Sequence, residues 1–220
     1  GNHGLGHVRY STFGSSSLRN VQPLVADYGH GSMAVAHNGN FVNADVLREE
    51  LEAQGAIFQS TTDSEVLVHL IARSGAETFT DRVVDALRRV IGAYSVVAMD
   101  QNVIVAARDP HGFRPLWLGR LDDSYVLASE TCALDIIDAE WVREVEPGEV
   151  VTVMKHRVRS RRPFKELVKP QQCMFEFIYV ARPDSYIFGK SVDEVRKEMG
   201  RRLARVAPVD ADMVMAVPDS

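Results

Sequence analysis

The sequence has 220 residues but only two cysteines, no long apolar run and no excess of basic charge. Cys132 and Cys173 do not make the disulfide framework of a small secreted domain, so we expect a cytoplasmic location. No run approaches the ~18 apolar residues of a membrane-spanning helix and no signal peptide is visible, so no membrane partner is expected. The net charge of −5 gives no electrostatic footprint for nucleic acid.

The remaining composition is that of an ordinary globular protein, with 45% hydrophobic and 25% charged residues. The length of 220 residues suffices for one large core or for one and a half domains. The only dense basic segment, residues 155–162, follows a strand pattern. This position favours a solvated edge strand over a site for polyanions.

Helical patterns dominate the first part of the chain and strand patterns the second. Helices are expected at 43–54, from Thr62 onward and at 80–91. The third helix presents an apolar stripe made of Val83, Val84, Leu87, Val90 and Ile91. Strands are expected at 33–36, 94–99, 103–107, 115–119, 125–129 and 149–154. This order predicts an α+β fold in which two antiparallel sheets pack together with helices outside.

The last 50 residues follow a different pattern. Residues 167–171 resemble a linker, and Ser191 with Glu194 forms a capping box that opens a helix to about Val206. An apolar run at 213–217 then predicts a strand. A helix followed by a buried strand is typical of the start of an α/β domain, so we expect one domain over 1–170 and the start of another over 171–220. The sequence begins without methionine and stops at this strand, which indicates an interior piece of a longer protein.

The dipeptide Asn38-Gly39 has two interpretations. It follows the apolar run 33–36 and precedes a helix, and Asn-Gly readily forms a tight turn because both residues tolerate positive φ. Alternatively, it forms an oxyanion hole, because the asparagine amide and the glycine N–H both donate hydrogen bonds. The dipeptide alone does not decide between them.

Arg9 and Asp63 are also ambiguous when taken singly. Arg9 lies in the strand-like segment 5–12, and its planar guanidinium suits either a small carboxylate or a surface ion pair. Thr62 and Glu65 read as a capping box, which places Asp63 in the first turn of a helix. There Asp63 either serves the helix end or faces a ligand ammonium group.

Six sequence blocks together resemble a known family. The blocks are His7–Thr12, His37–Asn40, Thr61–Glu65, Arg108–Leu116, Ser129–Asp135 and Phe175–Ser185. The first three resemble a class II glutamine amidotransferase domain. The last three are similar to the glutamine phosphoribosylpyrophosphate amidotransferases, and the hexosamine-forming amidotransferases lack the Arg182–Ser185 stretch.

The resemblance implies both a fold and an activity. The implied fold is a four-layer αββα sandwich of two antiparallel sheets, of the N-terminal-nucleophile hydrolase type, followed by the opening helix and strand of a phosphoribosyltransferase domain. The implied activity is glutamine hydrolysis with transfer of ammonia to phosphoribosyl pyrophosphate, giving 5-phosphoribosylamine in the first committed step of purine synthesis. Mg²⁺ would bind in the phosphoribosyltransferase part, and the intact protein would be a homo-oligomer.

The resemblance also implies roles for single residues. Arg9 would bind the α-carboxylate of glutamine and Asp63 its α-ammonium group, with Thr12 near the same ligand. Asn38 and Gly39 would donate hydrogen bonds to the tetrahedral oxyanion.

The sequence departs from the family at its nucleophile. The family uses an N-terminal cysteine activated by its own α-amine, whereas residue 1 here is glycine. We therefore expect the 220-residue chain to be inactive. Cys132 is expected to be a core thiol, and Cys173 is either a buried free thiol or one ligand of an iron–sulfur cluster. A non-catalytic glutamine-binding module and a hexosamine-type amidotransferase stay open as alternatives.

Overall fold

The computed structural model describes residues 3–9, 17–164 and 169–215. The helices are η1 (Leu18–Asn20), α1 (Ala44–Ala53), α2 (Ser64–Arg73), α3 (Phe79–Leu87), α4 (Thr131–Ile136), η2 (Glu176–Val180) and α5 (Val192–Val206). The strands are β1 (Leu24–Tyr28), β2 (Gly31–Phe41), β3 (Gly92–Met99), β4 (Ile104–Arg108), β5 (Trp117–Leu121), β6 (Ser124–Ala128), β7 (Glu140–Glu144), β8 (Val150–Met154), β9 (Arg157–Arg161), β10 (Tyr186–Ile187) and β11 (Lys190–Ser191).

The strands before residue 162 form two antiparallel sheets, as the sequence predicts. The larger sheet has the order β1-β2-β3-β4-β8-β9, and the smaller has the order β6-β5-β7. The basic segment 155–162 provides the edge strand β9, and Arg161 pairs with Asp81 of α3 at 2.7 Å. The edge-strand interpretation is thus confirmed.

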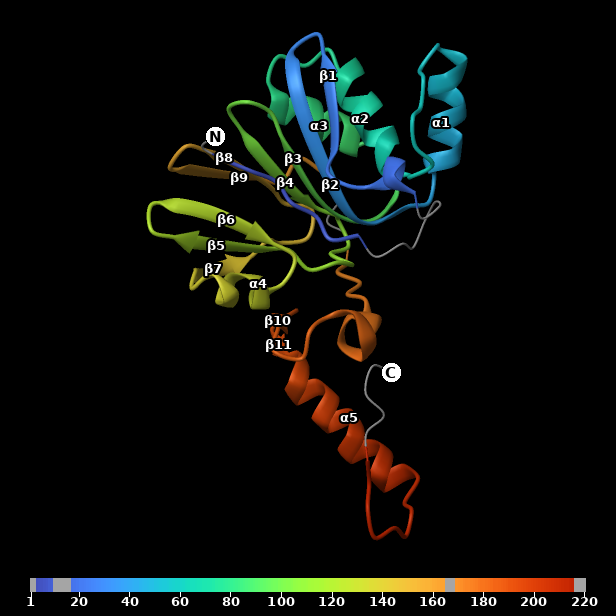
Figure 1. The fold of residues 1–220 in the computed structure, drawn as a ribbon, viewed down its shortest axis with the longest axis vertical. Helices are drawn as coiled ribbons and strands as arrows, with labels where there is room; N and C mark the ends of the chain where they lie inside the picture. Colours follow the sequence, from blue (N-terminus) through green and yellow to red (C-terminus); the bar gives the residue numbers. More distant parts are fainter. Residues whose placement is uncertain (1–2, 10–16, 165–168, 216–220) are drawn as a thin grey trace.

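Three clusters of apolar side chains hold these elements together. The largest joins α1, α2 and α3 to the larger sheet, and it includes Phe41, Leu67 and Val96. A second contains side chains of both sheets, such as Leu118 and Val151, and a third joins the smaller sheet to α4 through Trp117 and Leu134. Figure 1 shows the same arrangement, with α1–α3 beside the larger sheet and α4 beside the smaller one.

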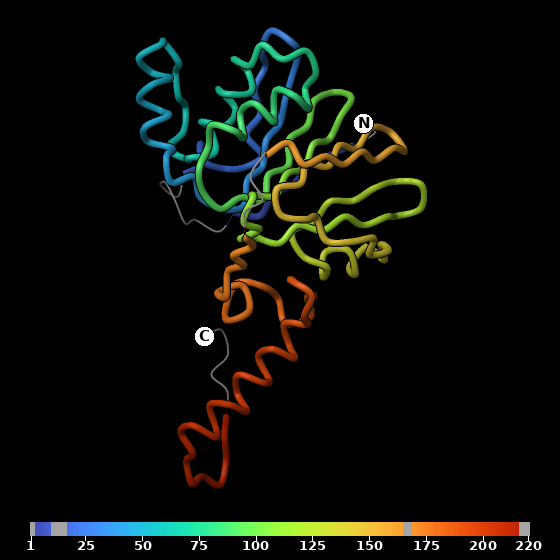
Figure 2. Tube along the Cα trace, turned by 180° about the vertical axis from the view of Figure 1, so that it is seen from behind, coloured from blue at the N-terminus to red at the C-terminus, as the bar shows by residue number. Residues whose placement is uncertain are grey.

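The C-terminal part extends away from the two sheets (Figures 1 and 2). Backbone bonds from Gln171 N to His111 O (2.8 Å) and from Cys173 N to Phe113 O (3.3 Å) attach its start to the loop before β5. The Ser191 side chain accepts from Glu194 N, which confirms the capping of α5. Among the described residues, no helix is long and apolar enough to cross a membrane.

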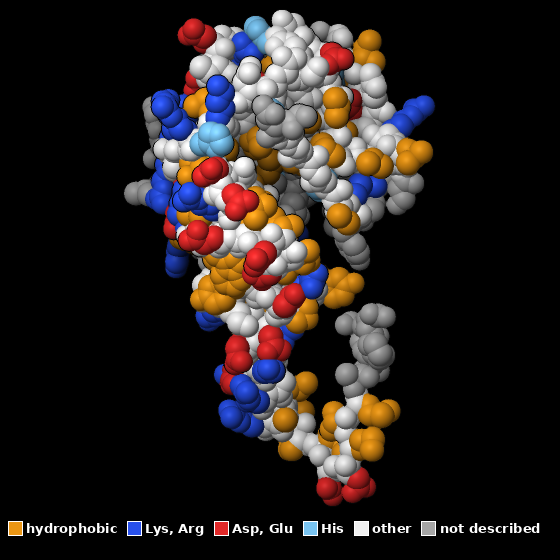
Figure 3. Space-filling view, turned by 60° about the vertical axis from the view of Figure 1, so that its left-hand side comes forward, with side chains coloured by type: hydrophobic (Ala, Val, Ile, Leu, Met, Phe, Trp, Pro, Cys, Tyr) orange, Lys and Arg blue, Asp and Glu red, His pale blue; other side chains and the backbone are white. Residues whose placement is uncertain are grey.

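The apolar side chains that follow α5 are exposed to solvent, whereas those of a buried strand would be packed against other elements. The predicted strand at 213–217 is absent over its described residues, and Met213, Val214 and Met215 are 74–91% exposed. No described strand lies beside them to form a sheet. Figure 3 shows the hydrophobic side chains exposed along the end of α5 and on the segment that follows.

Two earlier elements also differ from the predictions. The described part of the predicted strand 5–12 has no regular structure, and residues 3–9 pair with neither edge of the larger sheet. Helix α3 ends at Leu87, and Ile91 is 63% exposed rather than part of an apolar stripe. The reason is a turn into β3, in which Ile91 N donates to Asn43 Oδ1 at 2.8 Å and Ile91 O accepts from Val42 N. Strands β1, β7, β10 and β11 and helix α4 are elements that the sequence did not indicate.

Candidate functional site

Asn38 and Gly39 lie inside strand β2, so the turn interpretation is wrong. Asn38 is paired with Ser95 and Gly39 with Tyr94 of β3. Gly39 has a φ of +147°, and a Cβ atom there would lie 2.0 Å from Ala93 O. Glycine is needed because no side chain fits between the two backbones. The strand continues to Phe41, and the reversal into α1 comes only after it.

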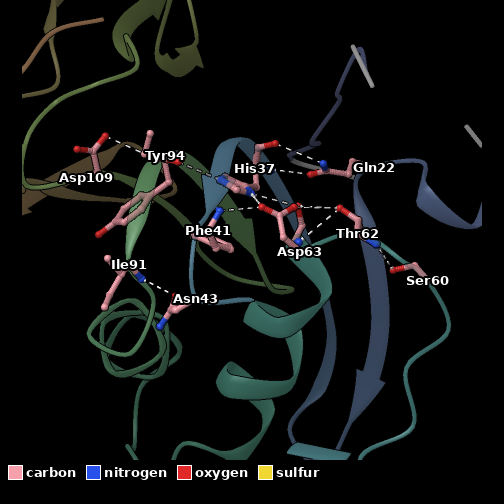
Figure 4. Close-up of polar contacts among 12 residues, drawn as sticks. Gln22, His37, Phe41, Asn43, Ser60, Thr62, Asp63, Ile91, Tyr94 and Asp109 are labelled. Carbon is pink, nitrogen blue, oxygen red and sulfur yellow. Dashed lines mark hydrogen bonds and ion pairs between the residues drawn. The ribbon is translucent and has the colours of Figure 1, made fainter. Parts of the chain in front are cut away.

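Asp63 joins the start of α2 to the same strand. Its Oδ2 accepts from Phe41 N at 2.8 Å, and the residue is only 5% exposed. Its Oδ1 has longer contacts, at 3.3 Å from Thr62 Oγ1 and 3.4 Å from Ser64 Oγ. Figure 4 shows this carboxylate between Phe41 and His37 on one side and Thr62 on the other. Asp63 therefore has a structural role in the fold, and its second oxygen has acceptor capacity left.

The predicted capping box of Thr62 and Glu65 is wrong. The Glu65 carboxylate accepts from Gln59 N and Ser60 N, both at 2.7 Å, instead of from the backbone of Thr62. Thr62 Oγ1 lies 3.4 Å from Ser64 N. Glu65 thus holds the loop before α2, which leaves Asp63 at the N-cap position.

A neutral histidine supports β2 next to Asn38. His37 is 3% exposed, its Nδ1 lies 3.1 Å from Ser64 Oγ, and its ring stacks on Phe41 with centroids 4.0 Å apart. Burial lowers the pKa of His37 to about 4, although the Asp63 charge opposes the shift. Gln22 holds the His37 backbone, accepting from its N–H at 2.7 Å and donating to its carbonyl at 3.3 Å. Ser64 stands in the block Thr61–Glu65 but had no assigned role, and no motif indicated Gln22.

The segment that carries Arg9 lies beside the same point of β2. Burial lowers the pKa of His7, the nearby His37 backbone opposes this shift, and the Arg9 charge adds to it to a lesser extent. Arg9 itself is half-buried. Segment 7–9, the Asn38-Gly39 pair and Asp63 are thus all gathered around residues 37–41. Thr12 lies outside the described residues.

A surface cavity of about 260 Å³ opens next to Asp63. Its lining consists of Ala44, Asp45, Arg48, Thr61, Thr62 and Asp63. Asn38 and Gly39 are not part of this lining.

Arg114 and Glu176 are site neighbours to which sequence reasoning gave no role. Arg114 Nη2 donates to Asn38 Oδ1 at 2.9 Å, and Arg114 Nη1 pairs with Glu176 Oε1 at 2.8 Å. Both residues lie in blocks that carried the family resemblance. Burial raises the pKa of Glu176 to about 7 against the opposing effect of Arg114.

The loop that carries Arg114 is shaped by Asp109. This buried carboxylate accepts from the backbone N–H groups of Tyr94, His111 and Phe113. Burial raises the pKa of Asp109, and these bonds oppose the shift.

The two cysteines differ in their burial. Cys132 is 6% exposed, and burial raises the pKa of its thiol, as expected for a core position. Cys173 is a free, half-buried thiol. Within residues 3–9, 17–164 and 169–215, no group of three or more His, Cys, Asp or Glu side chains could hold a metal ion. These residues alone therefore do not form an iron–sulfur site.

Comparison with known proteins places this arrangement in a family. A family model described as a glutamine amidotransferase domain matches residues 7–135. The chain is 53% identical to amidophosphoribosyltransferase 2, chloroplastic, of Arabidopsis thaliana, over 100% of the chain and 39% of the relative. The amidophosphoribosyltransferase of Bacillus subtilis is 46% identical, over 100% of the chain and 46% of the relative.

A solved structure supports the same assignment. Glutamine phosphoribosylpyrophosphate amidotransferase from B. subtilis, complexed with ADP and GMP, is 46% identical and superposes with a TM-score of 0.90. The superposition covers 97% of this chain and 46% of that one. The chain thus spans less than half the length of these relatives. It belongs to the glutamine amidotransferase domain family, and the two relatives named above, which match it over its whole length, are amidophosphoribosyltransferases.

Proposed function

We propose that this chain is the glutamine-binding part of an amidophosphoribosyltransferase. The whole protein would hydrolyse glutamine and pass ammonia to phosphoribosyl pyrophosphate, giving 5-phosphoribosylamine in the first committed step of purine synthesis. The observation that carries the proposal is the gathering of the Asn38-Gly39 pair, Asp63 and segment 7–9 around residues 37–41 of β2.

The chemistry of these groups matches glutamine. A free amino acid carries a carboxylate and an ammonium group, which Arg9 and Asp63 would bind through charge-assisted hydrogen bonds. Thr12 would lie near the same ligand. The Asn38 amide and the Gly39 N–H would donate to the oxyanion that forms when the side-chain amide is attacked, and one such donor is typically worth on the order of 3–4 kcal/mol of barrier.

The nucleophile would come from an N-terminal cysteine outside these 220 residues, with its α-amine as the base. Cys132 is unsuited to the role because its thiol is buried, with a raised pKa. The 220-residue chain alone should therefore release no ammonia from glutamine. Ammonia release that persists through purification would contradict this part of the proposal.

Several finer features belong to the same proposal. The two sheets and their helices would form the αββα sandwich of N-terminal-nucleophile hydrolases, with a domain boundary near residue 170. Mg²⁺ and phosphoribosyl pyrophosphate would bind to a phosphoribosyltransferase domain that begins at about 171. Cys173 would contribute to an iron–sulfur cluster only if further cysteines came from elsewhere. The whole protein would be a cytoplasmic homo-oligomer.

The proposal is tested by measuring 5-phosphoribosylamine formation in the full-length protein with glutamine and, separately, with ammonia. Arg9→Ala should weaken the use of glutamine and leave the ammonia-dependent activity intact, because ammonia does not need the amino-acid site. Equal loss of both activities would contradict the role given to Arg9. A parent protein active with neither donor would contradict the proposed function itself.

A glutamine-binding module without chemistry is the second candidate, and the burial of Cys132 favours it for the isolated chain. It differs from the first in predicting no glutamine hydrolysis by the full-length protein. The hexosamine-type alternative has less support, because the relatives that match the whole chain, including Arg182–Ser185, are amidophosphoribosyltransferases.

A further inference from the structure

The Asn38 side chain is fixed at one end by a group that can only donate. Arg114 Nη2 lies 2.9 Å from Asn38 Oδ1. An amide has an accepting oxygen and a donating NH₂ group, whereas a guanidinium has no acceptor. The opposite orientation of the amide would set NH₂ against the guanidinium. Arg114 therefore selects the orientation in which Oδ1 faces it and the donating Nδ2 is directed elsewhere.

Arg114 is in turn held at both its side chain and its backbone. Its Nη1 forms an ion pair with Glu176 Oε1 at 2.8 Å, and the two side chains are 19% and 1% exposed. Its carbonyl accepts from Arg108 Nε at 2.7 Å. Arg108 is itself buried and donates to the Val145 carbonyl at 2.6 Å. Such low exposure leaves little solvent to compete for the Arg114–Glu176 pair.

Glu176 reaches this site from a distant part of the chain. It opens η2, in the segment that is attached to the 111–113 loop by the backbone bonds from Gln171 and Cys173. Among the charged groups that shift the pKa of Glu176, Arg114 has the largest effect, followed by Glu130 and Arg108. Arg114 is the one that also contacts Asn38.

Resting on the proposed glutaminase function, we propose that Arg114 and Glu176 are positioning residues for the oxyanion hole. Glu176 holds Arg114, and Arg114 orients the Asn38 amide so that Nδ2 donates to the oxyanion. The donor is thus preset before the substrate arrives, which is the condition for effective transition-state stabilisation. The arrangement also makes the glutamine site depend on the docking of η2, which lies beyond the sheets.

Loss of the Arg114–Asn38 contact should lower kcat for glutamine. Removing an oxyanion donor outright costs about 100- to 1,000-fold in kcat, so a donor that is present but misaligned should cost less, on the order of 10- to 100-fold. The contact is proposed to act on the transition state and not on bound glutamine, so KM for glutamine should change little.

The test uses the full-length protein and its glutamine- and ammonia-dependent activities. Arg114→Met should lower the glutamine-dependent kcat about 10- to 100-fold with nearly unchanged KM and retained ammonia-dependent activity. Arg114→Lys and Glu176→Gln should show smaller losses, because each keeps part of the contact. Arg89→Met is the matched control, because it breaks an exposed ion pair of the same type, Arg89–Glu50 at 2.6 Å, and it should behave like the parent.

A double-mutant cycle separates positioning from a general structural effect. In an Asn38→Ala background, Arg114→Met should cause no further loss of kcat, since the group that it orients is gone. A loss equal to the product of the two single effects would overturn the proposal, as would a kcat of Arg114→Met equal to that of Arg89→Met. If Arg114→Met does not fold, the same cycle with Arg114→Lys decides. A parent with ammonia-dependent but no glutamine-dependent activity would refute the proposed function, and this inference with it.

Discussion

Replacing Asp63 by asparagine separates its role in the fold from its proposed role in binding. Asparagine has nearly the same shape, and its Oδ1 can still accept from Phe41 N, where the native carboxylate does so at 2.8 Å. The change therefore removes the negative charge while keeping the bond that joins α2 to β2. We expect stability to fall by only about 1 kcal/mol, the net worth of a typical hydrogen bond.

The effect on glutamine use should be larger. Asp63 is 5% exposed, so solvent screens its charge weakly, and a hydrogen bond between it and an ammonium group should contribute about 1.5–3 kcal/mol. Such a loss corresponds to a roughly 10- to 150-fold rise in KM. The ammonium group is bound equally in the ground state and the transition state, so kcat should stay close to that of the parent.

The assay is steady-state ammonia release from glutamine by the full-length protein. Asp45→Asn is the matched control, because Asp45 lines the same cavity as Asp63 but is exposed. It should leave KM nearly unchanged. If Asp63→Asn lowers the melting temperature but leaves KM at the parent value, Asp63 only supports the fold and our assignment is wrong.

Two further predictions concern β2. Gly39→Ala should destabilise the protein by at least about 2 kcal/mol in thermal unfolding, because the new Cβ would lie 2.0 Å from Ala93 O at a φ of +147°. Gly75→Ala is the control, because a Cβ added there would have no atom of the described residues, apart from its chain neighbours, within 4 Å, and it should not destabilise the protein. Equal effects of the two substitutions would refute the steric argument. His37 should make stability fall as the pH drops from about 6.5 to about 4, by roughly 3 kcal/mol in total, because the folded state with its lowered pKa binds the proton more weakly than the unfolded chain. His37→Gln should reduce the change of the urea midpoint with pH. If the midpoint of the variant changes with pH as much as that of the parent, His37 is not the cause.

Periodic patterns predicted helices α1, α2, α3 and α5 because the causes of these helices are local. The apolar positions of α5 and its Ser191 cap follow from neighbours a few residues away, and the structure contains both. Strand β7 was missed because Glu140–Glu144 is mostly exposed and shows no apolar alternation. The Asn38-Gly39 turn was wrong for the opposite reason, since a local signal was overruled by pairing with β3, which lies far along the chain.

The candidate site was predictable only where a motif marked it. Asn38, Gly39 and Asp63 stood in such motifs, and the structure gathers them around β2. Arg114 and Glu176 stood in matching blocks without an assigned role, because their contact joins residues that only the folded chain brings together. Gln22, which holds the His37 backbone, is marked by no pattern at all.

The most direct test of the central claim is a structure of the full-length protein with glutamate or an unreactive glutamine analogue bound. The account predicts that the α-carboxylate contacts Arg9 and the α-ammonium group contacts Asp63. The side-chain carbonyl oxygen should lie within hydrogen-bonding distance of both Asn38 Nδ2 and Gly39 N. A ligand bound away from residues 37–41, or one that leaves Arg9 and Asp63 without contact to it, would contradict the account.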